Sequence, residues 1–347
     1  MLSAAIEGMF LNSELFDHQR GASNKGYKKI DMGTLVLSTQ NLHLGNANVN
    51  LRFEHGMVSP AYKTYHIHDC SIKLIAELVK SDKAKRFFYN ATTVGASVCR
   101  RNVEWDTLYD QPLYLPSSIE QECLATFLSA LSSRINKQTE LVEHLKKYKR
   151  GLSESIFSTL SCPTQELSDV CNIVGGGTPD TGILEYWNGD ISWFTPTEVG
   201  KKKYVISSSR KITEEGLCKS SAKILPPDTV LLTSRATLGE MSLTTATCCT
   251  NQGFQSLVAK KDVVLPEYLY YLQTIIKPWC EKYSSGNTFR EISKKALGKC
   301  TIPVPSIMKQ KYIVDCLSLI DSKIEKSESV LEKLLRLKSA LLQQLYI

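Results

Sequence analysis

Polar side chains beside short β-rich runs are the groups in this sequence whose types and order best support chemistry. In the second half of the chain, Arg235 directly follows TVLLTS (229–234), and Asn251 and Gln252 come just before FQSLV (254–258). Guanidinium, amide and hydroxyl groups on loops can hydrogen-bond to base edges, and basic side chains suit phosphates. The sequence therefore predicts a polyanion-contacting surface, with further members Ser285, Asn287, Thr288 and Arg290 in SGNTFR (285–290), and Lys294 and Lys295 for phosphates. Solvated loop polarity is the alternative interpretation.

Weaker candidates are a lysine run and a set of loop residues in the first half of the chain. The run Lys201, Lys202 and Lys203 suits phosphate contact, although a solvated turn explains such a run equally well. In the first half, we expect contacts from residues that follow TLVLS (34–38), precede PAY (60–62) or lie near Trp105: Gln40, Asn41, Ser59, Arg100 and Arg101. The two arginines and Trp105 predict a basic ridge with apolar support.

Catalytic and metal-binding patterns are weak in this sequence. His66, His68, Asp69 and Cys70 are close together, but no second ligand pair lies nearby and 69–70 suit a turn, so we expect no metal. The sequence contains no G-x-S-x-G elbow, Walker A motif or N-P-P-[FY] box. GGGTP (175–179) lacks the remaining glycines of a dinucleotide fingerprint and is interpreted as a structural turn or a phosphate-facing loop. Trp187 and Trp193 are expected in the core.

Two long helices that repeat each other are predicted to position these loops. Residues 116–157 and 305–346 align without a gap at an offset of 189, with apolar residues at alternating steps of four and three. The polar interruptions Gln138 and Lys149 recur as Ser327 and Lys338. The predicted seam consists of Leu124, Leu128, Leu131, Ile135, Val142, Leu145, Leu152 and Ile156, repeated as Ile313, Leu317, Ile320, Ile324, Leu331, Leu334, Leu341 and Leu345. Ser117 or Ser118 is the expected N-cap of the first helix.

The predicted fold is α+β, with two β-rich globules separated by two helices that pack as an antiparallel coiled coil. The expected segments are a first globule (1–112), a first helix (113–157), a linker (158–164), a second globule (165–304) and a second helix (305–347). At ~1.5 Å per residue, each helix would be a rod on the order of 60 Å long. Such rods could hold two readers of a polymer apart, or could simply act as a scaffold.

The globules are weak copies of each other. TLVLS (34–38) matches TVLLT (229–233), Gly45 matches Gly239, and Tyr62 matches Phe254, at offsets that drift from 195 to 192. If the alignment of the two globules is extended towards the N-terminus at the same offset, Met1 corresponds to about Pro196. We therefore expect the first globule to lack an opening segment of about thirty residues, which corresponds to 165–195 of the second.

Composition is that of an ordinary cytoplasmic protein. A net charge of +7 from 42 basic and 35 acidic residues permits an anionic partner without requiring one. The eleven cysteines form no C-x-x-C pair, so neither a disulfide framework nor a zinc ribbon is predicted. The N-terminal residues do not resemble a signal peptide, and no apolar run reaches the ~20 residues of a membrane span.

The order of motifs resembles the specificity subunit of type I restriction-modification systems. The resemblance begins at LSDVCNIVGGGTPDTGILEYWNGDISWFTPTEV (167–199) and continues through LPPDTVLLTSRATLGEMSL (225–243), TNQGFQSLV (250–258), PEYLYYLQ (266–273) and SGNTFREISKKALGKCTIPVP (285–305). In the first half, GMFLNSELFDHQRGASNKGYKKIDMGTLVL (8–37), GMVSPAYKTY (56–65) and LYLPSSIEQECLATFLSAL (113–131) resemble a second such domain and its helix.

This resemblance implies a DNA-binding subunit that performs no chemistry itself. Each recognition domain would read half of a bipartite site in double-stranded DNA, and the helices would set the gap and dock two methyltransferase subunits. Motor-nuclease subunits would join the full complex. S-adenosylmethionine, ATP and Mg²⁺ would belong to those partners, with no cofactor in this chain. Two alternatives remain open: a truncated or recombining specificity subunit, and a coiled-coil scaffold that reads no DNA.

Overall fold

The computed structural model describes residues 1–16, 25–97, 100–286 and 290–345. Two compact units divide the chain. Unit 1 comprises Met1–Val142 and Lys326–Ile347, and unit 2 comprises Glu143–Glu325. Each unit therefore contains one globule and part of both long helices. None of the described helices is long and apolar enough to cross a membrane.

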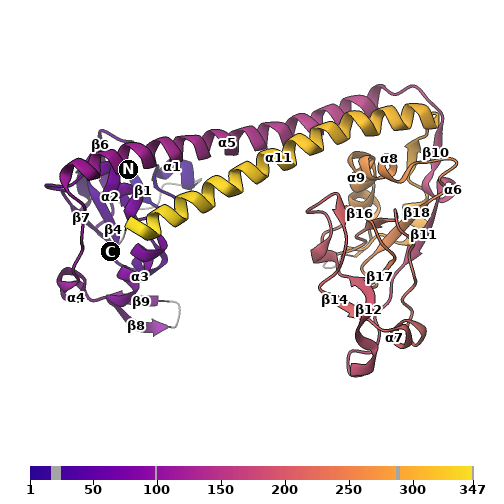
Figure 1. Ribbon diagram of the computed structural model, residues 1–347, viewed down its shortest axis with the longest axis horizontal. Coiled ribbons are helices and arrows are strands. Elements are labelled where there is room, and N and C mark those ends of the chain that lie inside the picture. The colour runs from indigo at the N-terminus through magenta and orange to yellow at the C-terminus, as the bar shows by residue number, and fades with distance from the viewer. Residues whose placement is uncertain (17–24, 98–99, 287–289, 346–347) are drawn as a thin grey trace. The chain divides into compact units, whose positions relative to one another are not determined.

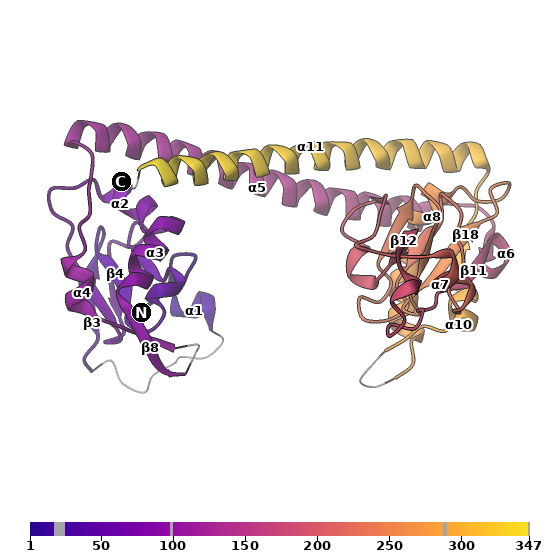
Figure 2. The same ribbon diagram turned by 60° about the horizontal axis from the view of Figure 1, so that its bottom comes forward.

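The two long helices are α5 (Ser118–Thr159) and α11 (Ile307–Leu345), which lie side by side in both views (Figure 1, Figure 2). Ser117 caps α5, since its backbone N–H and its hydroxyl both donate to the Glu120 carboxylate, at 2.9 and 2.8 Å. Every predicted seam residue whose side chain is described is buried or half-buried; Leu345 lies outside that set. The predicted α+β fold with two packed long helices is confirmed.

In each unit the helices run antiparallel. In unit 1, Ser132 of α5 contacts Lys338 of α11, and the Gln138 side-chain amide of α5 donates to the Ser327 carbonyl of α11 at 2.9 Å. A later residue of α5 thus contacts an earlier residue of α11, which is the antiparallel direction. The polar interruption at Gln138 and Ser327 is thus a contact between the helices. In unit 2, Lys149 contacts Asp321, while Phe157 shares a hydrophobic cluster with Ile313 and Leu317.

Unit 2 is built on a five-stranded sheet of order β11-β18-β15-β16-β13. A three-stranded sheet, β14-β12-β17, and a two-stranded sheet, β10-β19, complete it. The strands are β10 (Thr164–Glu166), β11 (Cys171–Gly175), β12 (Trp187–Phe194), β13 (Tyr204–Val205), β14 (Arg210–Ile212), β15 (Val230–Leu232), β16 (Met241–Thr244), β17 (Cys248–Thr250), β18 (Gln255–Ala259) and β19 (Thr301–Pro303). The α-helices are α6 (Leu167–Val170), α7 (Glu214–Cys218), α8 (Pro266–Tyr271), α9 (Gln273–Tyr283) and α10 (Lys294–Gly298), with 3₁₀ turns at Leu184–Tyr186 and Pro196–Glu198.

Unit 1 has smaller sheets: β5-β4-β7, β3-β6, β1-β2 and β8-β9. Its strands are β1 (Leu2–Ala4), β2 (Met9–Leu11), β3 (Lys28–Asp31), β4 (Leu35–Ser38), β5 (Ala47–Val49), β6 (His55–Val58), β7 (Tyr62–Tyr65), β8 (Thr92–Ser97) and β9 (Arg100–Val103). Its helices are α1 (Asn12–Leu15), α2 (Ile72–Leu78), α3 (Asp82–Asn90) and α4 (Trp105–Asp110), with a 3₁₀ turn at Leu42–Leu44. Two helices, α2 and α3, follow each other closely, and α3 starts anew because the Ser81 hydroxyl accepts the Ala84 N–H.

The duplication extends to the contacts that join each globule to its helix. At the start of α5, the Gln121 side chain accepts the Ser71 N–H and donates to the Pro116 carbonyl. At the start of α11, Gln310 accepts the Leu265 N–H and donates to the Pro305 carbonyl. Because both glutamines are buried and each bonds the residue just before a globule helix, the two globules attach to their helices in the same way.

Candidate nucleic-acid interface

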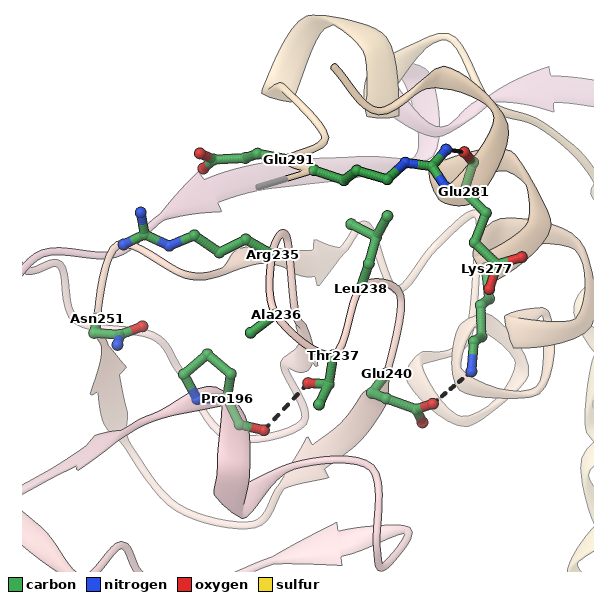
Figure 3. A pocket seen from close by; sticks show the side chains of 11 residues that line it. Pro196, Arg235, Ala236, Thr237, Leu238, Glu240, Asn251, Lys277, Glu281 and Glu291 are labelled. Atoms are coloured by element: carbon green, nitrogen blue, oxygen red, sulfur yellow. Dashed lines mark hydrogen bonds and ion pairs between the residues drawn. The ribbon is translucent and has the colours of Figure 1, made fainter. Parts of the chain in front are cut away.

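Three of the predicted contact residues, from three separate segments of unit 2, line one cavity. Arg235 follows β15, Asn251 follows β17, and Arg290 precedes the short connection to α10. The cavity has a volume of ≈ 1050 Å³, and Figure 3 shows Arg235 and Asn251 on one side of it, with Lys277 on the other. Sequence positions far apart are therefore brought to one concave surface.

A tight turn presents Arg235. Ala236 has φ 61° and Gly239 has φ 78°, so the backbone reverses within residues 235–239. The turn is fixed by Thr233, whose hydroxyl accepts the Glu240 N–H at 3.0 Å. A side chain at Gly239 would come within 2.9 Å of Lys277 Cγ, which requires glycine there. Within the described residues, the Arg235 guanidinium makes no hydrogen bond or ion pair, so its donors are available to a ligand.

The wall opposite Arg235 is held by α9. The Arg290 Nε donates to the Ser284 hydroxyl at 3.0 Å, and its Nη2 bonds the Glu281 carbonyl. Lys277 on α9 pairs with Glu240 at 2.6 Å. The carboxylates of Glu240, Glu281 and Glu291 also line the cavity. The surface thus offers both donors and acceptors, a mixture that suits base edges better than phosphates alone.

The glycine turn 175–177 supports Asn251 and Gln252. A Cβ on Gly176 would lie 2.1 Å from the Asn251 carbonyl oxygen, and the Gly177 N–H donates to the Thr250 carbonyl at 2.9 Å. The Thr178 hydroxyl bonds the Gln252 side-chain oxygen. The turn therefore packs against the loop that carries Asn251, which favours the structural interpretation of GGGTP.

Lys203 does not belong to a surface lysine run. Its side chain is buried, and its ammonium group donates to the Tyr271 hydroxyl at 2.9 Å and to the Ser318 hydroxyl at 3.1 Å. Burial lowers the pKa of Lys203, and nearby Asp321 partly opposes that shift. The phosphate prediction for Lys203 is wrong because α11 and Tyr271 cover its side chain. Lys201 and Lys202 are exposed, and for them it remains a prediction.

Ser285, Lys294 and Lys295, which are further candidates of unit 2, are exposed. Ser285 pairs with Glu291 as an isolated β-bridge, which closes the loop between them. Lys294 and Lys295 are exposed in the first turn of α10, where the Ser293 hydroxyl accepts the Ala296 N–H. Asn287 and Thr288 lie outside the described residues.

In unit 1 the predicted ridge of Arg101 on Trp105 does not form. The Arg101 guanidinium stacks over Tyr89 at 4.1 Å and bonds Thr92, because β9 pairs with β8 and faces that strand. Trp105 instead lies under the Lys63 ammonium group, at 3.9 Å. The side chain of Arg100 is outside the described set.

The other unit 1 candidates lie on turns. Gln40 and Asn41 are exposed, and their backbone N–H groups donate to the Ser38 hydroxyl. The half-buried Ser59 accepts the Ala61 N–H. These backbone contacts fix the loops and leave the side-chain amides of Gln40 and Asn41 on the surface, where DNA contact remains a prediction.

Trp187 and Trp193 are core residues, as expected. Their exposed fractions are 8% and 3%, and their rings meet edge to face at 5.1 Å.

The cluster of possible metal ligands in unit 1 includes His66 and His68, whose rings lie 6.3 Å apart. Among the described residues, His, Cys, Asp and Glu form no group of three or more that could hold a metal ion.

Three residues near the candidate surfaces were missed by the sequence argument. Glu240 and Lys277 form an ion pair between the Arg235 turn and α9, and Lys63 covers Trp105 in unit 1. Glu240 comes directly after Gly239, and this position next to a turn glycine is the sequence feature that could have identified it. The position of Lys277 depends on how α9 packs, and no local pattern reveals that.

Comparison with known proteins supplies the family. The profile described as "Type I restriction modification DNA specificity domain" matches residues 163–336, half of the chain. The MjaIX type I restriction enzyme specificity subunit of Methanocaldococcus jannaschii is 38% identical over 177 residues, which cover 49% of this chain and 41% of that protein. The corresponding EcoR124I/EcoR124II subunit of Escherichia coli is 28% identical over 45% of this chain and 40% of its own length. These alignments thus span less than half of either relative.

Solved structures agree with this fold. The S subunit of a type I restriction-modification system from M. genitalium aligns with a TM-score of 0.59 at 16% identity, covering 94% of this chain and 87% of that one. A chain from a type I R-M system aligns with a TM-score of 0.62 at 20% identity, covering 93% and 84%. The chain belongs to the family of type I restriction-modification DNA specificity domains.

Proposed function

We propose that this chain is the DNA-sequence specificity subunit of a type I restriction-modification complex. Each unit would read one half of a bipartite site in double-stranded DNA. The observation that carries the proposal is the cavity of unit 2, where Arg235, Asn251 and Arg290 converge from three loops of a domain matched by the family profile.

The polar groups of this surface divide into two roles. The Arg235 guanidinium, which has no partner among the described residues, can donate two hydrogen bonds to a guanine edge, and Asn251 can bond an adenine edge. Glu240 or Glu291 can accept a hydrogen bond from the cytosine amino group. The exposed Lys294, Lys295, Lys201 and Lys202 are suited to phosphates, which would fix the register without specifying sequence.

The helices would set the unread gap and dock two methyltransferase subunits. Each carries large apolar side chains that face solvent in its own unit: Ile119 (81% exposed) on α5, and Met308 (84%), Tyr312 (69%) and Leu319 (74%) on α11. Met308 is the repeat of Ile119 at the offset of 189, so related surfaces recur on the two helices. Exposed apolar side chains in such rows are typical of protein–protein contacts.

Chemistry would come from the partners. Methyltransferase subunits would bring S-adenosylmethionine, and motor-nuclease subunits in the full complex would bring ATP and Mg²⁺. This chain would supply sequence choice and geometry, in the cytoplasm. Arg235 and Asn251 would then select the bases at which the assembly binds.

The test is to express the chain with its methyltransferase and to map methylated bases across the host genome. The proposal predicts a split motif: two short specified halves that flank a fixed, unspecified gap. Charge reversal of Arg235 and Arg290 together should abolish methylation and leave the complex assembled. A complex that co-purifies and leaves no split methylated motif would contradict the proposal, as would unchanged methylation by the double variant.

A further inference from the structure

In unit 2, one segment closes the sheet edge and covers one side of the core. Residues 164–175 comprise β10, α6 and β11; β10 pairs with β19, and β11 pairs with β18 from Cys171 opposite Ala259 to Gly175 opposite Gln255. Four apolar side chains of this segment are buried in the main core: Leu167 (0% exposed), Val170 (0%), Cys171 (2%) and Ile173 (5%). The segment therefore contributes both strand pairing and apolar packing.

Unit 1 repeats the strand that accepts this segment. In β4 and β7, Leu35 lies opposite Tyr65, and in β15 and β18, Val230 lies opposite Leu257. Since Leu35 corresponds to Val230, β7 is the counterpart of β18. Over the described residues, β7 pairs with β4 and its other edge has no strand partner. That open edge corresponds to the one that β11 occupies in unit 2.

Side chains that β10 covers in unit 2 are buried, whereas their counterparts in unit 1 are exposed. Ile302 in β19 is fully buried opposite Gln165, whereas its counterpart Leu113 is 44% exposed. Tyr114, the counterpart of the buried Pro303, is 66% exposed. Residues 112–114 belong to no strand. Among the residues of unit 1 that the structure describes, no strand covers either of the surfaces to which β10 and β11 attach in unit 2.

An apolar groove lies between these two surfaces. A cavity of ≈ 350 Å³ is lined by Tyr65, Ile67, Cys70, Leu113 and Leu115, mainly with apolar atoms. Leu115 also lines a neighbouring cavity of ≈ 510 Å³, together with Tyr114 and Gln344 of α11. The two cavities share Leu115 and lie within unit 1, one beside the end of α11 and the other beside β7.

The end of α11 agrees with the path of the segment in unit 2. The last described helical residue, Leu345, corresponds to Ile156 in α5 at the offset of 189. Thr164, the first residue of β10, comes eight residues after Ile156. A segment that followed the same path in unit 1 would therefore enter the groove beside the end of α11.

We propose that unit 1 binds, in this groove, a peptide segment with the chemistry of residues 164–175. The segment would pair with 112–114, form one helical turn over Leu113 and Leu115, and then add a strand to the open edge of β7. Its requirements are apolar side chains at the positions of Leu167, Val170 and Ile173, and free backbone groups for strand addition. An open apolar strand edge is a natural template for such pairing. The inference rests on the internal duplication and does not depend on DNA binding.

The first test uses the full-length chain and a fluorescent peptide with the sequence of residues 163–178. The expected result is saturable binding, with slower hydrogen exchange over 61–70 and 112–116. Leu113→Asp should weaken binding at least tenfold, because it places a charge against the apolar segment. Leu113 is half-exposed, so the change should not unfold the unit. The matched control is Leu44→Asp, at an exposed leucine (49%) outside the groove, which should leave binding unchanged.

The second test joins a copy of residues 158–178 to the end of the chain, which raises the local concentration of a weakly binding segment. Hydrogen exchange over 61–70 should slow at least tenfold, and Leu113→Asp should cancel the effect. The proposal is overturned if neither the peptide nor the fusion protects these residues, or if protection is confined to unit 2. It is also overturned if Leu113→Asp has no effect, or if two copies of the chain pair through β7 and the peptide does not compete.

Discussion

Lys338 of α11 should anchor the first globule to its helices, through a contact that the repeat places at a matched position in each unit. In unit 1, the Lys338 ammonium group lies 2.6 Å from the Glu77 carboxylate and donates to the Ser132 hydroxyl at 2.8 Å. The Ser132 hydroxyl donates to the other Glu77 oxygen at 2.7 Å. Glu77 lies on α2, so the contact joins the globule to both long helices.

Unit 2 contains the same three groups, with the carboxylate and hydroxyl exchanged. Lys149, the repeat of Lys338, contacts Asp321 at 2.5 Å, and the Tyr271 hydroxyl donates to the second Asp321 oxygen at 2.6 Å. Asp321 is the repeat of Ser132, and Tyr271 is the counterpart of Glu77 on the globule helix. Each lysine therefore forms an ion pair with one carboxylate: Lys338 with Glu77 of the globule, and Lys149 with Asp321 of the other long helix.

The perturbation is Lys338→Met, which removes the charged partner of Glu77 and keeps its hydrogen bond from the Ser132 hydroxyl. The two side chains are 24% and 17% exposed. Removing one partner of a fully buried pair costs about 3–5 kcal/mol, and partial exposure reduces this to about 2 kcal/mol. Lys338→Met combined with Glu77→Leu removes both charges and should restore stability to within about 1 kcal/mol of the wild type.

Hydrogen exchange measured by mass spectrometry suits this prediction, because it reports each unit separately. A loss of about 2 kcal/mol corresponds to exchange roughly thirtyfold faster in peptides covering α2 and residues 118–135. Peptides from unit 2 are the internal control and should not change. The reasoning is refuted if Lys338→Met alone leaves exchange in unit 1 within about threefold of the wild type, or if the double variant exchanges as fast as the single one.

Three further predictions address the DNA surface, the docking surface and pH. Lys294→Ala with Lys295→Ala should weaken DNA binding for all sequences and reduce the slope of log affinity against log salt by about 2, as measured by fluorescence anisotropy; an unchanged slope would exclude phosphate contacts there. Met308→Glu with Tyr312→Glu should reduce co-purification with the methyltransferase at least tenfold, whereas Leu184→Glu, at another exposed apolar side chain (77%), should not; equal losses would argue against docking on α11. Burial lowers the pKa of Lys80 to about 8 in the folded chain, while the unfolded chain keeps the proton up to about 10.4, so this group makes unit 1 more stable as pH rises between these values. After allowance for solvent screening, the unfolding free energy from urea titration should rise between pH 7.5 and 9.5 by on the order of 1 kcal/mol more in the wild type than in Lys80→Met, and parallel dependences would contradict the assignment.

The helices could be predicted residue by residue because their periodicity reflects burial directly. Alternating steps of four and three place Leu128, Ile135 and Val142 on one face, and all three are buried. The break between α2 and α3 was also present in the sequence, since Ser81 followed by Asp82 is a common helix start.

Part of the candidate site could be predicted from contact residues that follow strand ends. Arg235 and Asn251 meet this condition, and the structure brings both to one cavity. Lys203 looked like part of a charged run, yet its partners Tyr271 and Ser318 come from α8 and α11, far along the chain. Similarly, the stacking of Arg101 on Tyr89 depends on how β8 and β9 pair, which local sequence does not determine.

Methylation maps of the wild type and of Arg235→Ala, each expressed with the methyltransferase, test the central claim most directly. Lys261→Ala, which removes an exposed basic side chain of unit 2 (63% exposed), is the matched control. We predict a split motif in which Arg235→Ala relaxes one position of one half by about 1–3 kcal/mol of discrimination and leaves the other half and the gap unchanged. A continuous motif, a change in both halves, or maps identical to the wild type would contradict the account.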